Sequence, residues 1–165
     1  MHVKLRKKYG QNFLIDKNII DKIINLINYN KINILEIGPG DGKLTNKIVN
    51  KKPKNLDLIE IDKDLVDCLR YKFGIYKFVN VINANVLKYN LNKKYDLVIS
   101  NLPYNISSQV LVKLVLMDVT PKEMILMFQR EFAIKLTDKK LNAINSIINC
   151  FYKINIKFHV SKNCS

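Results

Sequence analysis

The chain has 165 residues and is 48% hydrophobic, which is enough for one folded domain with a hydrophobic core. Its formal net charge of +14 favours an acidic partner, nucleic acid first, although a coding bias toward Lys, Asn and Ile would also supply surface lysines. The three cysteines and two histidines match no metal motif, which disfavours a metal protein. No apolar run approaches a membrane span, which disfavours a membrane protein. The basic N-terminus lacks the apolar segment of a secretory signal, which disfavours an exported protein.

The first expected elements are a basic arm over residues 1–16 and an amphipathic helix over about 17–29. The helix has isoleucines at 19, 20, 23, 24 and 27, which recur on one face, and Asp16 is a plausible N-cap. Reduced cysteines fit a cytoplasmic protein, with an organellar matrix as the alternative.

A strand, a glycine turn and a helix follow. Residues 32–37 form an apolar run, Gly38-Pro39-Gly40-Asp41-Gly42 holds three of the five glycines, and a helix is predicted over about 43–49. This order is typical of the entry to a nucleotide-binding βαβ unit, in which glycines let the backbone approach a ligand. Glycine alone is weak evidence, because any tight turn can use it.

The second predicted strand, 55–62, carries Glu60 near its end, 22 residues after Gly38. That spacing is expected of an acidic residue that accepts hydrogen bonds from both ribose hydroxyls of a nucleotide. The alternative is that Glu60 and Asp62 both cap the helix predicted over 63–72.

The remaining elements continue the alternation of strands and helices. A third strand over 78–83 precedes Asn85, which could reach an adenine edge. Further strands are expected at 95–100, 123–128 and 153–160, and helices at 106–117, 129–136 and 141–151. The pattern predicts an α/β fold with a mostly parallel sheet.

The turn after the fourth strand reads Asn101-Leu102-Pro103-Tyr104. Its pattern, a small polar residue, any residue, proline and an aromatic, resembles the loop of methyltransferases that modify amino groups of nucleic acids. The Asn101 oxygen and the carbonyl of Leu102 or Pro103 could accept both N–H bonds of an adenine amine, and Tyr104 could stack on the base. The alternative is that these residues only shape a strand-to-helix turn.

Several segments together resemble the small-subunit ribosomal RNA adenine N6,N6-dimethyltransferases. They are 10–14, 36–45, 59–65, 101–107 and 128–133, in the right order and spacing. Related enzymes that act on large-subunit RNA usually differ at the positions of Pro39 and Leu102.

The resemblance implies a Rossmann-like class I methyltransferase fold, S-adenosylmethionine as donor, and two methylations on each of two adjacent adenines near the 3′ end of small-subunit ribosomal RNA. It implies a monomer in which residues 1–165 form the methyltransferase domain, with the RNA or a pre-ribosomal particle as partner. Carried over by position, the cofactor contacts are Asn12, Leu14, Gly38, Glu60, Asn85 and Asn101, and the catalytic residues are Asn101, Leu102, Pro103 and Tyr104.

Two departures from the family pattern stand out. Asn85 replaces an aspartate, so weaker cofactor binding is expected. The chain ends at Ser165, before the family's seventh strand and helical domain, which suggests a C-terminal truncation. These departures leave a second functional hypothesis open: a catalytically impaired, RNA-binding ribosome-assembly factor derived from such an enzyme.

Overall fold

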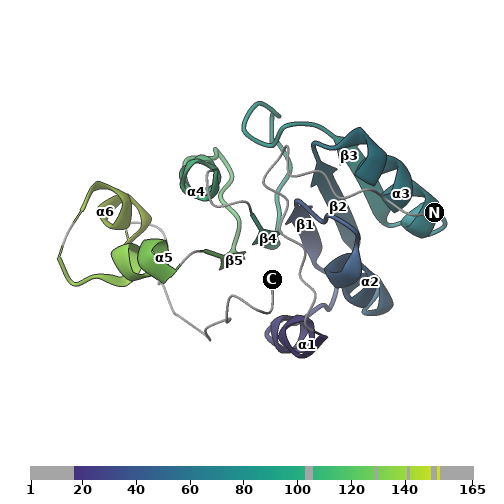
Figure 1. Cartoon of the computed structure of the whole chain (residues 1–165), viewed down its shortest axis with the longest axis horizontal. Coiled ribbons are helices and arrows are strands. Elements are labelled where there is room, and N and C mark those ends of the chain that lie inside the picture. Colours follow the sequence, from purple (N-terminus) through teal and green to yellow (C-terminus); the bar gives the residue numbers. More distant parts are fainter. Residues whose placement is uncertain (1–16, 103–105, 129, 141, 150–151, 153–165) are drawn as a thin grey trace.

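The computed structural model describes residues 17–102, 106–128, 130–140, 142–149 and 152, and its core is a parallel five-stranded sheet (Figure 1). The strands are β1 (Asn33–Ile37), β2 (Asn55–Glu60), β3 (Val79–Asn83), β4 (Leu97–Asn101) and β5 (Glu123–Met127). The helices are α1 (Lys17–Asn25), α2 (Lys43–Asn50), α3 (Lys63–Phe73), α4 (Ser107–Val115), α5 (Arg130–Thr137) and α6 (Ala143–Asn149). The predicted α/β class and parallel sheet are confirmed.

The strand order is β3-β2-β1-β4-β5, with every neighbouring pair parallel. The order reverses beside β1, whose neighbours are β2 and β4. Such a reversal leaves a crevice at the carboxyl ends of the strands, where open α/β sheets bind ligands.

Helices cover both faces of the sheet, and the buried side chains fall into separate clusters. One cluster joins α1, α2 and α3 to one face, with Ile34 and Leu56 fully buried in it. A second joins α4 and the segment that precedes β4 to the other face, around Leu35 and Val98. Strands buried on both faces read as continuous apolar runs, as β1, β2 and β4 do.

A third, smaller cluster packs α5 and α6 against α4 and β5. Leu111 and Leu136 are buried in it. Figure 1 shows α5 and α6 at one end of the molecule, beyond β5, and α3 at the other end.

Most element boundaries agree with the sequence predictions, and the differences have local causes. The first helix ends at Asn25 rather than near residue 29, because the Leu26 and Ile27 amides bond three residues back and tighten the turn. Ile27 still packs against the core. The helices expected at 106–117 and 141–151 are Ser107–Val115 and Ala143–Asn149.

The second strand ends at Glu60 instead of residue 62, since Asp62 accepts a hydrogen bond from the Asp64 amide (2.9 Å) and caps α3. The arm over 1–16 and the strand expected at 153–160 lie outside the described residues.

Candidate active site at the carboxyl edge of the sheet

The carboxyl ends of the strands bring together residues that are far apart in the sequence. In the sheet register Ile37 lies beside Ile59 and Ser100, and Glu60 lies beside Asn83. The Ser100 hydroxyl donates to the Ile37 oxygen (3.0 Å), which fastens β4 to β1 at this edge. The turns that follow β1, β2, β3 and β4 therefore start from a common edge.

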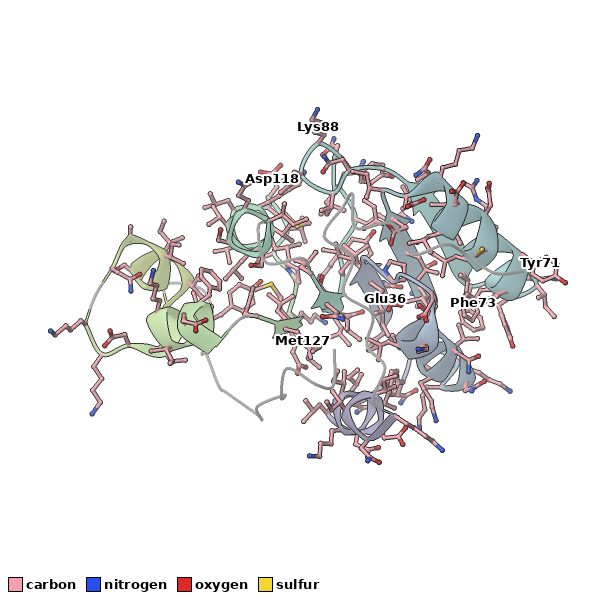
Figure 2. The ribbon with its side chains drawn as sticks, viewed as in Figure 1. Glu36, Tyr71, Phe73, Lys88, Asp118 and Met127 are labelled. Carbon is pink, nitrogen blue, oxygen red and sulfur yellow. The ribbon has the colours of Figure 1, made fainter. Side chains whose placement is uncertain are left out.

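The glycine turn after β1 depends on backbone conformations that other residues rarely adopt. Gly38, Gly40 and Gly42 have φ angles of 67°, 61° and 83°. A Cβ on Gly42 would lie 2.7 Å from the Phe73 ring, so the turn also needs glycine to pack against α3. Figure 2 shows Phe73 pointing from α3 into the molecule.

Gly38 and Asn101, both predicted from the sequence as cofactor contacts, lie side by side. A Cβ built on Gly38 would lie 4.0 Å from the backbone oxygen of Asn101. The Gly38 amide donates to the Ile59 oxygen (2.9 Å), which fixes the start of the turn. The bare backbone of Gly38 is thus placed where β1, β2 and β4 end.

Glu60 links β2 to the glycine turn. Its carboxylate accepts from the amides of Ile61 (2.9 Å) and Asp62 (3.0 Å) and from the amide of Gly40 (3.3 Å). Burial raises the pKa of Glu60, while these three backbone bonds act in the opposite direction. The carboxylate is positioned beside the glycine turn, and its bonds go to residues ahead of α3, so Asp62 is the helix cap.

Glu36 is a second buried carboxyl at this edge, one that the sequence analysis did not single out. It is 2% exposed and accepts from the Thr45 hydroxyl (2.7 Å) at the start of α2 (Figure 2). Burial raises the pKa of Glu36 to about 7, the Thr45 bond opposes this, and the charges of Glu60 and Asp41 add to it. Its position within the apolar strand, just before the glycines, was the available signal.

Asn85 lies in the turn after β3, half-buried, and its side chain shapes that turn. Its Oδ1 accepts from the Leu87 amide (3.0 Å), and its backbone oxygen accepts from the Lys88 and Tyr89 amides. The amide of the neighbouring Ala84 donates to the backbone oxygen of Glu60 (3.0 Å). Asn85 and Glu60 therefore belong to adjacent strand ends, which the strand order decides.

Asn101 and Leu102 are the described part of the predicted catalytic loop. Asn101 is the last residue of β4 and is half-buried, whereas Leu102 is 3% exposed and packs with Ile37 and Val110. The Leu102 side chain anchors the start of the loop in the core. Four other predicted site residues lie outside the described residues: Asn12, Leu14, Pro103 and Tyr104.

The turn that contains Asn85 is also tied to α4, the helix that follows the predicted catalytic loop. The Lys113 ammonium donates to the backbone oxygens of Leu87 (3.0 Å) and Tyr89 (2.6 Å). Burial lowers the pKa of Lys113. No sequence pattern indicated this contact, since it joins residues more than twenty positions apart.

Two features are absent from the described residues. They contain no group of three or more His, Cys, Asp or Glu side chains arranged to hold a metal ion. Within the same residues, no helix is both long and apolar enough to cross a membrane.

Comparison with known proteins identifies the family. The model of the family described as ribosomal RNA adenine dimethylase matches residues 2–157. The chain is 37% identical to ribosomal RNA small subunit methyltransferase A of Pelagibacter ubique, over 95% of this chain and 62% of that protein. It is 40% identical to the protein of the same name from Malacoplasma penetrans, over 96% of this chain and 60% of that one. The chain thus spans about three-fifths of the length of these curated relatives.

A solved structure shares the fold. The dimethyladenosine transferase of Plasmodium falciparum is 32% identical and superposes with a TM-score of 0.68, covering 76% of this chain and 46% of that one. The predicted family resemblance and the predicted class I methyltransferase fold are confirmed. The chain belongs to the ribosomal RNA adenine dimethylase family.

Proposed function

We propose that this chain transfers methyl groups from S-adenosylmethionine to N6 of two adjacent adenines near the 3′ end of small-subunit ribosomal RNA. The observation that carries the proposal is the meeting of the glycine turn, Glu60 and the start of the Asn101 loop at one edge of the sheet. Family membership supports the same activity. On this proposal residues 1–165 form one methyltransferase domain, a monomer that works where ribosomes are made, in the cytoplasm or an organellar matrix.

The carboxyl edge fits a cationic nucleotide-like donor. In a chain with a net charge of +14, this edge carries Glu60, Asp62 and Asp41, the last of which pairs with Lys43 (3.4 Å), and the bare Gly38 backbone faces the end of β4. The side chain of Glu60 would accept from a ribose diol, since a carboxylate has more lone pairs than its three amide bonds occupy. When bound, S-adenosylmethionine supplies an electrophilic methyl group on a sulfonium.

The proposed cofactor contacts extend around this edge. The Asn85 side chain would meet the adenine of the cofactor, and the acidic groups would complement its positive charge. The full proposed set is Asn12, Leu14, Gly38, Glu60, Asn85 and Asn101.

The catalytic loop would act by orienting the substrate amine. That amine is a poor nucleophile because its lone pair is delocalised into the ring. The Asn101 oxygen and the backbone carbonyl of Leu102 or Pro103 would accept its N–H bonds and turn the lone pair toward the donor, while Tyr104 stacks on the base. Leu102, anchored in the core, supports this role because it fixes where the loop begins.

The decisive experiment measures cofactor binding and methyl transfer separately. Calorimetry with S-adenosylmethionine tests the first, and incorporation of labelled methyl groups into small ribosomal subunits that lack the two dimethyladenosines tests the second. A chain that binds these subunits but not S-adenosylmethionine would support the assembly-factor alternative instead.

Variants of the loop test the assigned roles. Asn101→Ala should lower kcat far more than cofactor affinity, because its oxygen acts mainly in the transition state. Tyr104→Phe should be mild and Tyr104→Ala severe, since stacking needs the ring rather than the hydroxyl. A Tyr104→Phe protein as inactive as Tyr104→Ala would contradict the stacking role.

A further inference from the structure

The edge of the sheet opposite the candidate active site carries exposed lysines, one or more ahead of each of the five strands. We call this set the basic edge. One lysine from each turn is Lys31 before β1, Lys54 before β2, Lys77 before β3, Lys94 before β4 and Lys122 before β5. In sequence these lysines are scattered over some ninety positions, and only the parallel sheet brings them to one side of the molecule.

Backbone bonds between neighbouring strands show that the strand starts form a common edge. The Lys54 amide donates to the Ile32 oxygen (3.0 Å) ahead of β1. The Asp96 amide donates to the Asn33 oxygen (2.9 Å), which brings the start of β4 beside that of β1. The parallel registers of β2 with β3 and of β4 with β5 extend the edge on both sides.

Two lysines of this edge adopt a conformation that lysine rarely adopts. Lys31 and Lys52 have φ angles of 54° and 51°, and they are the non-glycine residues with positive φ among those the structure describes. Asparagine adopts this left-handed region more readily, and it is abundant in this chain. A coding bias toward Lys and Asn would supply surface lysines in general, but it would not explain why lysine stands where asparagine would be less strained.

An exposed aromatic side chain stands six residues ahead of Lys77, in the helix that leads to the turn before β3. Tyr71, in the last turn of α3, is 89% exposed, and Ile75 in the following turn is 78% exposed. The last turn of α3 also reaches the glycine turn, since the Lys72 ammonium donates to the Asp41 oxygen (2.7 Å), and the chain runs on from there to Lys77 before β3. Figure 2 shows Tyr71 pointing away from the body of the molecule. Aromatic rings among lysines are typical of surfaces that bind nucleic acid through stacking and phosphate contacts.

Acidic side chains offset little of this charge. Asp57 is buried and pairs with Lys93 (2.9 Å), and Asp96 pairs with Lys122 (3.0 Å). The exposed acidic groups near the edge are Asp118 and Glu123, against lysines in every turn. The excess is positive ahead of β1, β2, β3 and β4, whereas ahead of β5 the single Lys122 stands against Asp118 and Glu123.

The geometry points to a second RNA-binding surface on the basic edge, which holds the phosphate backbone of an RNA segment other than the one that carries the target adenine. Strands of five or six residues separate the two edges by roughly 16–20 Å at about 3.3 Å per residue. One strand of RNA passing the active site therefore does not also cover the basic edge. This inference takes from the proposed function only that the partner is ribosomal RNA, and the surface would recognise folded RNA by charge rather than by sequence.

The test measures binding of a fluorescent hairpin RNA by anisotropy at several salt concentrations, without cofactor. The turn before β2 carries three exposed lysines, Lys51, Lys52 and Lys54, and replacing them together by Gln should weaken binding by about tenfold or more at low salt. It should also lower the slope of log K against log salt by about 0.7–0.9 for each phosphate that the variant no longer neutralises. The matched control replaces Lys135, Lys139 and Lys140 by Gln, which removes the same charge from α5 and the turn after it, beyond β5 (Figure 1). The control should change both quantities much less.

A second variant separates RNA binding from folding. Lys52→Asn should leave the thermal midpoint unchanged or raise it, because asparagine tolerates the left-handed conformation, and should still lower RNA affinity several-fold. Tyr71→Ala should lower affinity without changing the salt slope, since stacking releases no counterions.

Three outcomes would overturn the inference. The first is equal RNA affinity in the triple variant and the unmodified protein. The second is an equal loss of RNA affinity in the α5 control. The third is a triple variant that binds phosphatidylserine vesicles more weakly while its RNA binding is unchanged. Because none of these measurements needs cofactor or methyl transfer, a chain that fails to methylate can still pass this test, and an active enzyme can fail it.

Discussion

At the scale of single residues, Glu60 holds the turn and is proposed to hold the ligand. Its carboxylate already accepts hydrogen bonds from the amides of Gly40, Ile61 and Asp62. These bonds offset part of the free-energy cost of burying the charge before any ligand binds. A ribose diol would add hydrogen bonds to an anion that is fixed in place, which strengthens them.

Glu60→Ala should therefore weaken S-adenosylmethionine binding by about 1.5–3 kcal/mol, as for a hydrogen bond to a charged group, and Glu60→Gln should weaken it less. Calorimetry measures both. Asp67→Ala is the control, since Asp67 is an exposed carboxylate on α3 whose ion-pair partner is Arg70. Melting curves without cofactor show how much of any loss comes from the turn itself. Equal affinity in all variants would rule out the ribose assignment.

Glu36 makes folding stability depend on pH. Its folded pKa is raised from 4.5 to about 7, chiefly by burial, so the folded state holds a proton that the unfolded state loses. The stability that this carboxyl contributes is complete below pH 4.5 and is lost as the pH rises through about 7.

Glu36→Gln should remove this dependence, because glutamine keeps the Thr45 bond and never ionises. Urea unfolding at pH 5 and at pH 8 should show a smaller loss of stability in the variant, by up to roughly 3 kcal/mol. Parallel pH curves for the two proteins would mean that Glu36 ionises in the folded state as readily as in water.

At the scale of elements, the segment that precedes β4 is fastened to β2 by one buried carboxylate. Asp57 accepts from the Tyr95 hydroxyl (2.6 Å), the Lys93 ammonium (2.9 Å) and the Asn55 amide (3.0 Å). Burial raises the pKa of Asp57, but these bonds outweigh it, and the net pKa is lowered. This contact sets where β4 starts, and so where the Asn101 loop begins.

Tyr95→Phe should lower the free energy of unfolding by about 1.5–3 kcal/mol, because a buried charge loses a donor. The matched control is Tyr29→Phe, which removes a bond to the neutral Ile24 oxygen (3.0 Å) and should cost about 0.5–1.5 kcal/mol. Since the pKa of Asp57 is lowered, its contribution is present above its unfolded pKa of 3.8 and is lost as the pH falls through the folded value. The excess cost of Tyr95→Phe should therefore shrink in acid, and an unchanged excess would contradict the assignment.

At the scale of the whole molecule, the separate hydrophobic clusters predict uneven stability. Leu35 in β1 and Val98 in β4 are completely buried, whereas β5 is half-buried and, among the described strands, pairs with β4 alone. The cluster that holds α5 and α6 is also the smallest of the three.

Native-state hydrogen exchange should accordingly find that the amides of Leu35 and Val98 exchange only through global unfolding, while those of Ile125 and Leu126 exchange through a smaller opening. Leu114→Ala should create a cavity in the cluster around Leu35 and Val98 and lower the free energy of unfolding by about 2–5 kcal/mol. Amide exchange at Leu35 and Val98 should then become faster by the factor that corresponds to this whole loss. Equal protection of β4 and β5 would show that the sheet opens as one unit.

Local sequence patterns were sufficient to predict most elements and the edge of the sheet that carries the candidate site. Apolar periodicity predicted the five described strands and the helices between them, because burial on one or both faces leaves a local pattern. The spacing of Gly38 and Glu60 and the turn at Asn101 indicated the site, because glycine turns and strand ends have a local chemistry. Helix ends were off by a few residues, since tight terminal turns leave a weaker signal.

Which of these residues meet depends on the tertiary structure. The order β3-β2-β1-β4-β5 places Gly38 beside Asn101, buries Glu36, and gathers the lysines of five separate turns on the opposite edge. The contacts of Asp57 with Tyr95 and of Lys113 with Leu87 likewise join different elements. Local patterns specify strands and turns but not strand order. The order of the strands in a parallel sheet determines which distant residues share an edge and which charged side chains are buried away from solvent.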